Sequence, residues 1–301
     1  MLHCGTPLKS SFVGQCIYCG HREGLTDEHA PPFSLTGNAH VLHEAVCAKC
    51  KRDTHGHEER FVSKCLGPLR HGRLMPSRGN TRRKSGLPRG ALVTLMRTDK
   101  STSRQYVESK DLPKFTFMLP RYELPPFLMV RPSPEERRWK GARWMQTCID
   151  LGDLEHQAKE FGAIIVPECD EADACRTLAK MAYGVAVGWL GVDGWTPYLR
   201  DYIRGKPPPG PIRNYIGSQF AFTLDKANLQ PEQENQVVIT VSLFPLPNAN
   251  HRCVFANIHI LPNIGQARPP NERVPYFGVL VGKCSEEKYQ ETQNGQGGRE
   301  V

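Results

Sequence analysis

Two cysteine pairs near the start of the chain constrain its fold more than any other feature. Each pair has the spacing Cys-x-x-Cys, and together they comprise Cys16, Cys19, Cys47 and Cys50. A single pair indicates little, but two pairs supply the four thiolates of a tetrahedral structural zinc site. The 27 residues between the pairs exceed the short span of a plain zinc ribbon. The predicted clip therefore encloses further structure.

The enclosed segment and the residues after it predict two strands followed by a helix. The predicted elements are a strand GLTDEH (24–29), a loop APPFSLTGN (30–38), a strand AHVLHEAV (39–46) and a helix CKRDTHGHEERFVSKCL (50–66). Gly56 is the only weak point of the helix. The order is ββα, and an acid-histidine pair, Glu28 and His29, ends the first strand.

A zinc-clipped ββα unit with this acid-histidine pair resembles the HNH endonuclease family, in the zinc-bearing branch of the ββα-metal nucleases. The resemblance covers residues 12–75. The positions that match the family pattern are Cys16, Cys19, Gly20, Glu28, His29, Pro31 or Pro32, Gly37, Asn38, Cys47 and Cys50. It implies that Glu28 is a ligand of a catalytic divalent cation and that His29 is the general base.

Lys51 departs from the family pattern, which usually has Asn or His directly after the last cysteine. A protonated lysine cannot ligate a metal, so a substitute must come from the same face of the helix. His55 lies four residues after Lys51, and Thr54 and Glu58 form a neighbouring pair with the same spacing. We favour His55 and Glu58 over His57 as the remaining ligands. The resemblance thus implies a structural Zn²⁺ and a catalytic Mg²⁺, Mn²⁺ or Ni²⁺.

Positive charge is concentrated in one segment. The net charge is +8, and residues 60–98 hold ten Lys and Arg and no acidic residue. Because this segment is rich in Arg and interrupted by Gly, Pro and Ser, it suits an arm that lies along phosphates, although a charged run is often only a solvated face. The nucleic-acid contacts expected from it are Arg70, Arg73, Arg78, Arg82, Arg83 and Lys84.

Composition and the lack of export signals exclude other classes. With 301 residues, of which 39% are hydrophobic and 23% charged, the chain resembles a globular protein rather than a disordered or fibrous one. Neither a signal peptide nor an apolar run long enough to span a bilayer is recognisable. Eleven cysteines, an odd number, favour reduced thiols or metal ligands over a disulfide framework. We therefore expect a cytoplasmic protein without a membrane partner.

The expected fold class is α+β, in three zones. Residues 1–75 form the zinc-clipped ββα lobe, 76–165 a basic linker with a β-rich region, and 166–301 a mixed region with antiparallel strands and one or two helices. In the middle zone, four β-type runs are interpreted as strands of one antiparallel sheet, at 91–97, 104–110, 114–120 and 126–132.

The third zone predicts a long helix that begins after Asp170, a good N-cap, and ends at Gly191. Its segment from Leu178 to Trp189 is interpreted as core rather than as a cofactor site. The remaining expected elements are a second helix at 195–205, strands at 235–247, 251–262 and 275–284, and a disordered tail at 285–301.

The leading expectation is a metal-dependent HNH endonuclease that hydrolyses phosphodiester bonds, with double-stranded DNA as its partner. Histidine, with an unperturbed pKa of about 6.5, can accept a proton from water near neutral pH. A hard divalent cation can neutralise the phosphate oxygens. The alternative is a non-catalytic zinc module that binds nucleic acid or a protein partner. The acid-histidine pair favours the enzyme, and Lys51 favours the alternative.

Overall fold

The structure is a computed structural model. It describes residues 2–4, 10–36, 40–72, 90–113, 116–121, 143–148, 151–166, 168, 170–220, 237–245, 251–260 and 275–296. The helices are α1 (Phe33–Thr36), α2 (Ala48–Arg60), α3 (Gly67–Gly72), α4 (Leu151–Phe161), α5 (Glu171–Leu190), α6 (Arg200–Ile203) and α7 (Glu286–Gln296), with a π-helical turn η1 (Phe61–Cys65) after α2 and a 3-10 turn η3 (Ile212–Asn214). None of these helices combines the length and apolarity needed to cross a membrane.

Antiparallel pairing dominates the sheets. The largest sheet has the order β1-β12-β13-β14-β10, and β11 also pairs with β14; its strands are β1 (Leu2–Cys4), β10 (Trp195–Pro197), β11 (Ile216–Phe220), β12 (Val237–Pro245), β13 (His251–Ile260) and β14 (Pro275–Ser285). The three strands predicted at the end of the chain are confirmed as β12, β13 and β14, and the structure places them side by side in one sheet.

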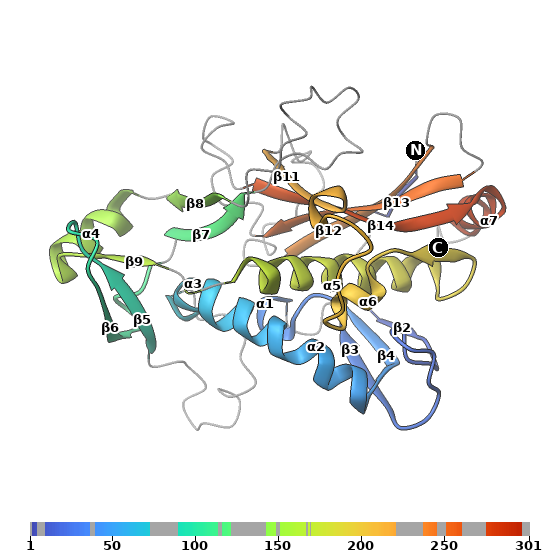
Figure 1. Ribbon diagram of the computed structural model, residues 1–301, viewed down its shortest axis with the longest axis horizontal. Helices are drawn as coiled ribbons and strands as arrows, with labels where there is room; N and C mark the ends of the chain where they lie inside the picture. The colour runs from blue at the N-terminus through green and yellow to red at the C-terminus, as the bar shows by residue number, and fades with distance from the viewer. Residues whose placement is uncertain are drawn as a thin grey trace.

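Helix α5 forms the middle layer of the molecule. It contacts β12, β13 and β14 on one side and α2 on the other, and Figure 1 shows it between the large sheet and the N-terminal elements. The predicted N-cap is confirmed, because the Asp170 carboxylate accepts hydrogen bonds from the backbone N–H groups of Ala172 and Asp173. Gly191, at a φ of 78°, ends the helix as predicted.

The N-terminal elements follow the predicted ββα order. Strand β3 (Leu25–His29) pairs antiparallel with β4 (Val41–Cys47), and β2 (Ser10–Phe12) pairs with β4 in parallel. Helix α2 follows β4 directly. The short helix α1 lies inside the segment that was predicted to be only a loop.

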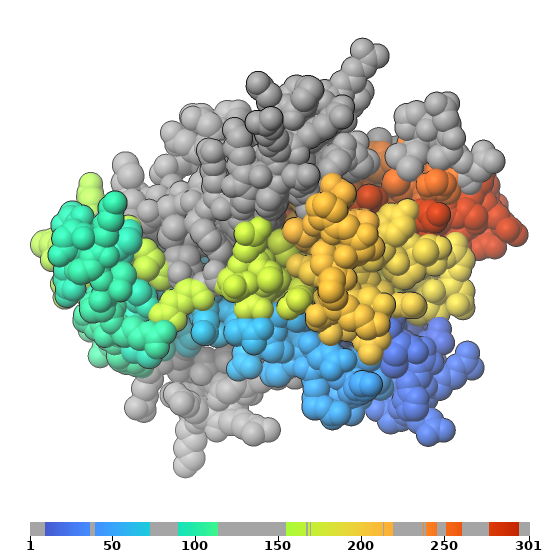
Figure 2. Space-filling view, in the orientation of Figure 1, coloured from blue at the N-terminus to red at the C-terminus, as the bar shows by residue number. Residues whose placement is uncertain are grey.

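One hydrophobic core joins the first and last zones of the chain. Buried residues of the ββα unit, such as Tyr18 and Phe61, belong to the same cluster as Leu178 of α5 and Phe277 of β14. In Figure 2 the blue surface of the N-terminal unit adjoins the yellow surface of the later elements. The first and last zones therefore share one core, whereas the described part of the middle zone has a smaller cluster of its own, around Val93, Leu95 and Ile165.

The prediction of one sheet in the middle zone is wrong. Strands β5 (Gly90–Met96) and β6 (Thr102–Glu108) form a sheet with β9 (Ile164–Val166), whereas β7 (Thr116–Arg121) pairs with β8 (Arg143–Cys148). Strand patterns identify strands but not their partners, and two of these partners lie outside the segment from which the sheet was predicted. The fourth predicted strand, 126–132, lies outside the described residues.

Two predictions for the last zone also need correction. The segment predicted as a second helix contains a strand, β10, and only one helical turn, α6, because Trp195 to Pro197 pair with β14 at the end of the large sheet. The tail predicted to be disordered forms helix α7 over residues 286–296. Tyr289 of this helix is buried, and Arg252 lies over its ring while pairing with Glu286. These contacts with β13 stabilise a helix whose own sequence is polar.

Candidate metal centre and cleft

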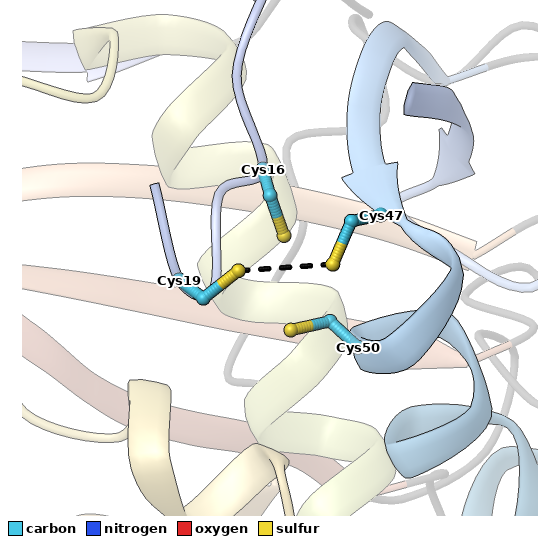
Figure 3. A group of neighbouring side chains, drawn as sticks. All are labelled: Cys16, Cys19, Cys47 and Cys50. Carbon is cyan, nitrogen blue, oxygen red and sulfur yellow. Dashed lines mark hydrogen bonds between the residues drawn. The ribbon is translucent and has the colours of Figure 1, made fainter. Parts of the chain in front are cut away.

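The four predicted cysteines meet at one point. Their sulfur atoms all lie within 4.8 Å of one another, and Cys19 Sγ is 3.7 Å from Cys47 Sγ (Figure 3). A zinc ion with Zn–S bonds of about 2.3 Å requires sulfur atoms about 3.8 Å apart, whereas a disulfide requires about 2.05 Å. The cluster therefore fits a tetrahedral metal ion, and these four cysteines could hold zinc.

Local backbone geometry explains how each pair forms. Gly20 has a φ of 76°, a left-handed conformation that favours glycine, and its N–H donates to the carbonyl of Cys16 at 2.8 Å. The N–H of Ile17 donates to Ala45 of β4 at 2.9 Å, which holds the first pair against the second. The second pair spans the junction of β4 and α2, with Cys47 as the N-cap of the helix.

The start of α2 also lowers the pKa of one cysteine of the cluster, Cys47. Burial alone would raise the pKa of Cys47, but the backbone N–H of Cys50 and the thiol groups of Cys19 and Cys16 outweigh it and lower the pKa to about 7. Burial raises the pKa of Cys16 and Cys50, so these thiols keep their protons until a cation replaces them. Metal binding at the cluster must accordingly release protons.

A cleft of about 430 Å³ lies along the other part of α2. It is lined from β3 by Asp27, Glu28 and His29, from α2 by Lys51, Thr54, His55, Glu58 and Glu59, from the residues around η1 and α3 by Val62, Ser63, Arg70 and His71, and further by Phe33, Ser34 and Lys180. The structure thus brings Glu28, His29, His55 and Glu58 to the same cleft, as the sequence analysis expected.

Strand β3 positions the acid-histidine pair through an irregularity. Between the pairs Thr26–Val46 and Glu28–Leu42 the register of β3 against β4 shifts, and Glu44 takes a φ of 49°. The Asp27 carboxylate accepts a hydrogen bond from the backbone N–H of Glu44 at 3.3 Å and lies 3.1 Å from His43 Nδ1. Bulges of this kind commonly aim side chains beside functional sites. Here the bulge immediately precedes Glu28 and His29.

His29 is partly buried at the rim of the cleft. Its ring meets the ring of Phe33 edge to face, with centroids 5.6 Å apart. Phe33 follows the two prolines after His29 and begins α1, so the loop that closes β3 also orients the imidazole. The side chain remains accessible enough to line the cleft.

Glu28 is bound to a residue that the sequence analysis did not name. Its carboxylate lies 2.6 Å from the Lys180 ammonium of α5 and accepts a hydrogen bond from the Tyr18 hydroxyl at 3.3 Å. Glu58 is also hydrogen-bonded to Lys180. Burial lowers the pKa of Lys180, but the carboxylates of Glu28 and Glu58 outweigh it and raise the pKa above its usual range. Lys180 is therefore a charged ammonium between two carboxylates.

The other predicted residues of α2 divide by exposure. His55 is 69% exposed, with its Nε2 atom 3.5 Å from a carboxylate oxygen of Glu59. His57 is buried and does not line the cleft, and burial, then Lys180, lower its pKa to about 3. The sequence analysis favoured His55 and Glu58 over His57 as ligands, and the buried position of His57 outside the cleft agrees with that preference. Lys51 donates to Thr26 Oγ1 at 3.1 Å and stands at the cleft wall.

Of the basic segment, residues 60–98, the structure describes 60–72 and 90–98. Arg70 lines the cleft and donates to the carbonyls of Ser34 at 3.1 Å and Val62 at 3.4 Å; burial lowers its pKa to about 10. The other predicted nucleic-acid contacts, Arg73, Arg78, Arg82, Arg83 and Lys84, lie outside the described residues.

A sequence signal for Lys180 exists. It is the only charged residue between Arg176 and Asp193, within a helix that was interpreted as core. A lysine inside a buried apolar helix requires charged partners. The signal predicts that a partner exists but does not identify it.

Comparison of the chain with family models, with curated proteins and with solved structures found no significant match in any of the three.

Proposed function

We propose that the chain is an HNH-type endonuclease that hydrolyses phosphodiester bonds in double-stranded DNA, with His29 as its general base. One observation carries the proposal: His29 at the end of β3 and His55 and Glu58 on α2 line the same cleft, beside a cluster of four cysteines that could hold zinc. This is the arrangement that the resemblance to the HNH family implies.

The reaction would use the cleft as follows. His29 takes a proton from a water molecule, the water oxygen forms a bond to phosphorus, and the bond from phosphorus to the leaving sugar oxygen breaks. Solvent protonates the leaving oxygen. Lys51 and Arg70, which line the cleft, would attract the phosphate oxygens. A positioned general base contributes about 10²–10⁴-fold to such a rate.

A catalytic Mg²⁺, Mn²⁺ or Ni²⁺ does not fit the predicted ligands as they are arranged. Hard cations need carboxylate oxygens with free lone pairs and an open coordination position. Glu28 and Glu58 are instead both bound to the Lys180 ammonium. Of the three predicted ligands, Glu28 and Glu58 contact Lys180, whereas the described contact of His55 is with Glu59.

This arrangement favours a second candidate function. A zinc module that binds DNA without cutting it needs no divalent cation beside His29, and the Lys180 contacts agree with such a module. The same cleft and basic residues would then serve binding alone.

A plasmid-nicking assay tests the proposal. We expect the zinc-loaded protein to relax supercoiled plasmid, with Mg²⁺, Mn²⁺, Ni²⁺ and no added divalent cation compared in parallel. His29→Ala should lower the rate by about 10²–10⁴-fold while zinc content and DNA binding stay intact. His21→Ala, at an exposed histidine outside the cleft, is the matched control and should nick at the parent rate. Equal nicking by His29→Ala and the parent contradicts the proposal, and DNA binding without nicking in every condition supports the second candidate.

A further inference from the structure

Lys180 is held in place by a row of contacts along α5. Four residues at helical spacing on this helix each meet the ββα unit: Asp173 pairs with Arg60, Thr177 donates to the carbonyl of His57, Lys180 binds Glu28 and Glu58, and Gly184 packs against Ala30. Because residues three and four apart share one face of a helix, these contacts fix the rotation and depth of α5. Lys180 lies in the middle of the row.

Gly184 allows the helix to approach closely. A Cβ atom at this position would stand 2.8 Å from the Cβ of Ala30, closer than real Cβ atoms come. Ala30 directly follows His29 and Glu28, and Gly184 lies four residues after Lys180. The glycine therefore brings the lysine of α5 to the end of β3. Lys180 is not a surface lysine that folded back, since its side chain is only 5% exposed.

The Lys180 ammonium lies between the carboxylates of Glu28 and Glu58. The side chain of Glu28 is 6% exposed and that of Glu58 is 20% exposed, so the two carboxylates face each other with little water to separate their charges. Such a pair needs a cation between its members. A second cation entering the same gap would be repelled by the ammonium at short range and would find the carboxylate oxygens already bound.

We propose that Lys180 is a built-in competitor of divalent cations at the Glu28–Glu58 pair, and that this pair becomes a divalent cation site only when the ammonium is removed. The proposal concerns equilibrium binding of a cation. It therefore stands apart from the proposed nuclease activity, which has its own test in plasmid nicking.

Binding of Mn²⁺ to the zinc-loaded full-length chain tests the proposal. Mn²⁺ prefers oxygen ligands over thiolates, so it leaves the cysteine cluster to zinc, and loss of the free-ion signal in electron paramagnetic resonance measures its binding. Lys180→Met should bind about one Mn²⁺ per chain, roughly tenfold or more tighter than the parent does. The double variant Lys180→Met/Glu58→Gln should return to the parent's weak binding.

The matched control is Lys51→Met. Lys51 is a cation on the wall of the same cleft, but it donates to Thr26 rather than to either carboxylate. Its removal changes the net charge of the cleft by the same amount and should leave Mn²⁺ affinity within about twofold of the parent. If Lys51→Met strengthens Mn²⁺ binding as much as Lys180→Met, general charge explains the result and the proposal is overturned.

A second measurement does not depend on the folding of Lys180→Met. Because the ammonium already occupies the gap, Glu58→Gln in the otherwise unchanged chain should leave Mn²⁺ binding as in the parent. A tight Mn²⁺ in the parent that Glu58→Gln abolishes would show that the cation displaces Lys180, and would overturn the proposal. A folded Lys180→Met protein without Mn²⁺ binding would overturn it equally. Neither result depends on whether plasmid is cut.

Discussion

Two clusters of ionisable side chains lie at the start of helix α2 and further along it, and they differ in where a balancing cation comes from. At its start, four cysteines converge with their sulfur atoms within 4.8 Å of one another, and a metal ion held there would come from outside the protein. Further along, Glu28 and Glu58 also converge, but the cation between them is Lys180 of the protein itself. One helix thus supports a cluster that could hold a metal and a cluster whose cation comes from the chain.

The comparison shows what each cluster depends on. Each pair of the cysteine cluster is built locally, through a turn at Gly20 and the junction of β4 with α2, and the pairs are 28 positions apart, from Cys19 to Cys47. The carboxylate cluster is completed by a residue 122 positions away from Glu58. The first cluster depends on local geometry and could hold a metal, whereas the second depends on the packing of α5 against the ββα unit.

Removal of the metal should have the largest effect. Cys47→Ser should abolish zinc binding and unfold the core shared by the ββα unit, α5 and the large sheet, because structural zinc contributes about 10–16 kcal/mol and whole domains have only about 5–15 kcal/mol of stability. Elemental analysis and thermal unfolding by circular dichroism measure the two effects. Cys65→Ser, at a buried cysteine outside the cluster, should keep about one zinc per chain.

The opposite result is informative. If Cys47→Ser melts only a small part of the structure and the remainder unfolds at the parent temperature, the ββα unit would be an independent lobe. Such a result would contradict the shared core, in which residues of both regions are buried together.

Removal of Lys180 should have the second largest effect. Lys180→Met leaves Glu28 and Glu58 without their cation and should lower the free energy of unfolding by about 3–5 kcal/mol, the usual cost of breaking a buried ion pair from one side. Urea denaturation of the zinc-loaded protein measures the loss. Glu28→Gln in addition to Lys180→Met should recover much of it, because one buried charge is then gone. A loss below about 1 kcal/mol would contradict a buried ionic contact here.

The same variant should depend on pH in a defined direction. Burial raises the pKa of Glu28, and Lys180 opposes that shift. Without the lysine, the pKa of Glu28 in the folded protein should rise further above its value in the unfolded chain. The unfolded state then releases the proton more readily, so the stability of Lys180→Met should be highest in mild acid and fall as the pH rises through the pKa of Glu28. The variant's loss relative to the parent should accordingly be greater at pH 8 than at pH 5.

The same distinction explains how much of the molecule the sequence predicts. The cysteine cluster, the two strands and helix of the ββα unit, the limits of α5 and the three final strands follow from short-range spacing and from caps such as Asp170. The partners of β7 and β9 do not, because a strand pattern is the same whichever strand it pairs with. Helix α7 was missed for a similar reason, since its stability comes from Tyr289 and Arg252 in tertiary contact.

The residues of the cleft likewise include some that the sequence predicted and one, Lys180, that it did not. The resemblance to the HNH family predicted that Glu28, His29, His55 and Glu58 lie at one site, and these residues do line one cleft. Lys180 could not be placed there, because its place is determined by how α5 crosses the end of β3. A lysine in an apolar helix predicts a buried charged partner. Only the packing of α5 shows that its partners are the predicted metal ligands Glu28 and Glu58.

The smallest expected effect tests that packing directly. Gly184→Ala adds one methyl group 2.8 Å from the Cβ of Ala30 and should push α5 away from β3, at a cost of about 1–3 kcal/mol in the free energy of unfolding. The zinc content should not change, since the cysteine cluster does not depend on this contact. Ala30→Gly removes the opposing methyl group, so the double variant Gly184→Ala/Ala30→Gly should be more stable than Gly184→Ala alone. Urea denaturation of the four proteins forms a double-mutant cycle. Strict additivity of the two changes would mean that Gly184 does not set the approach of α5, and that the position of Lys180 must have another cause.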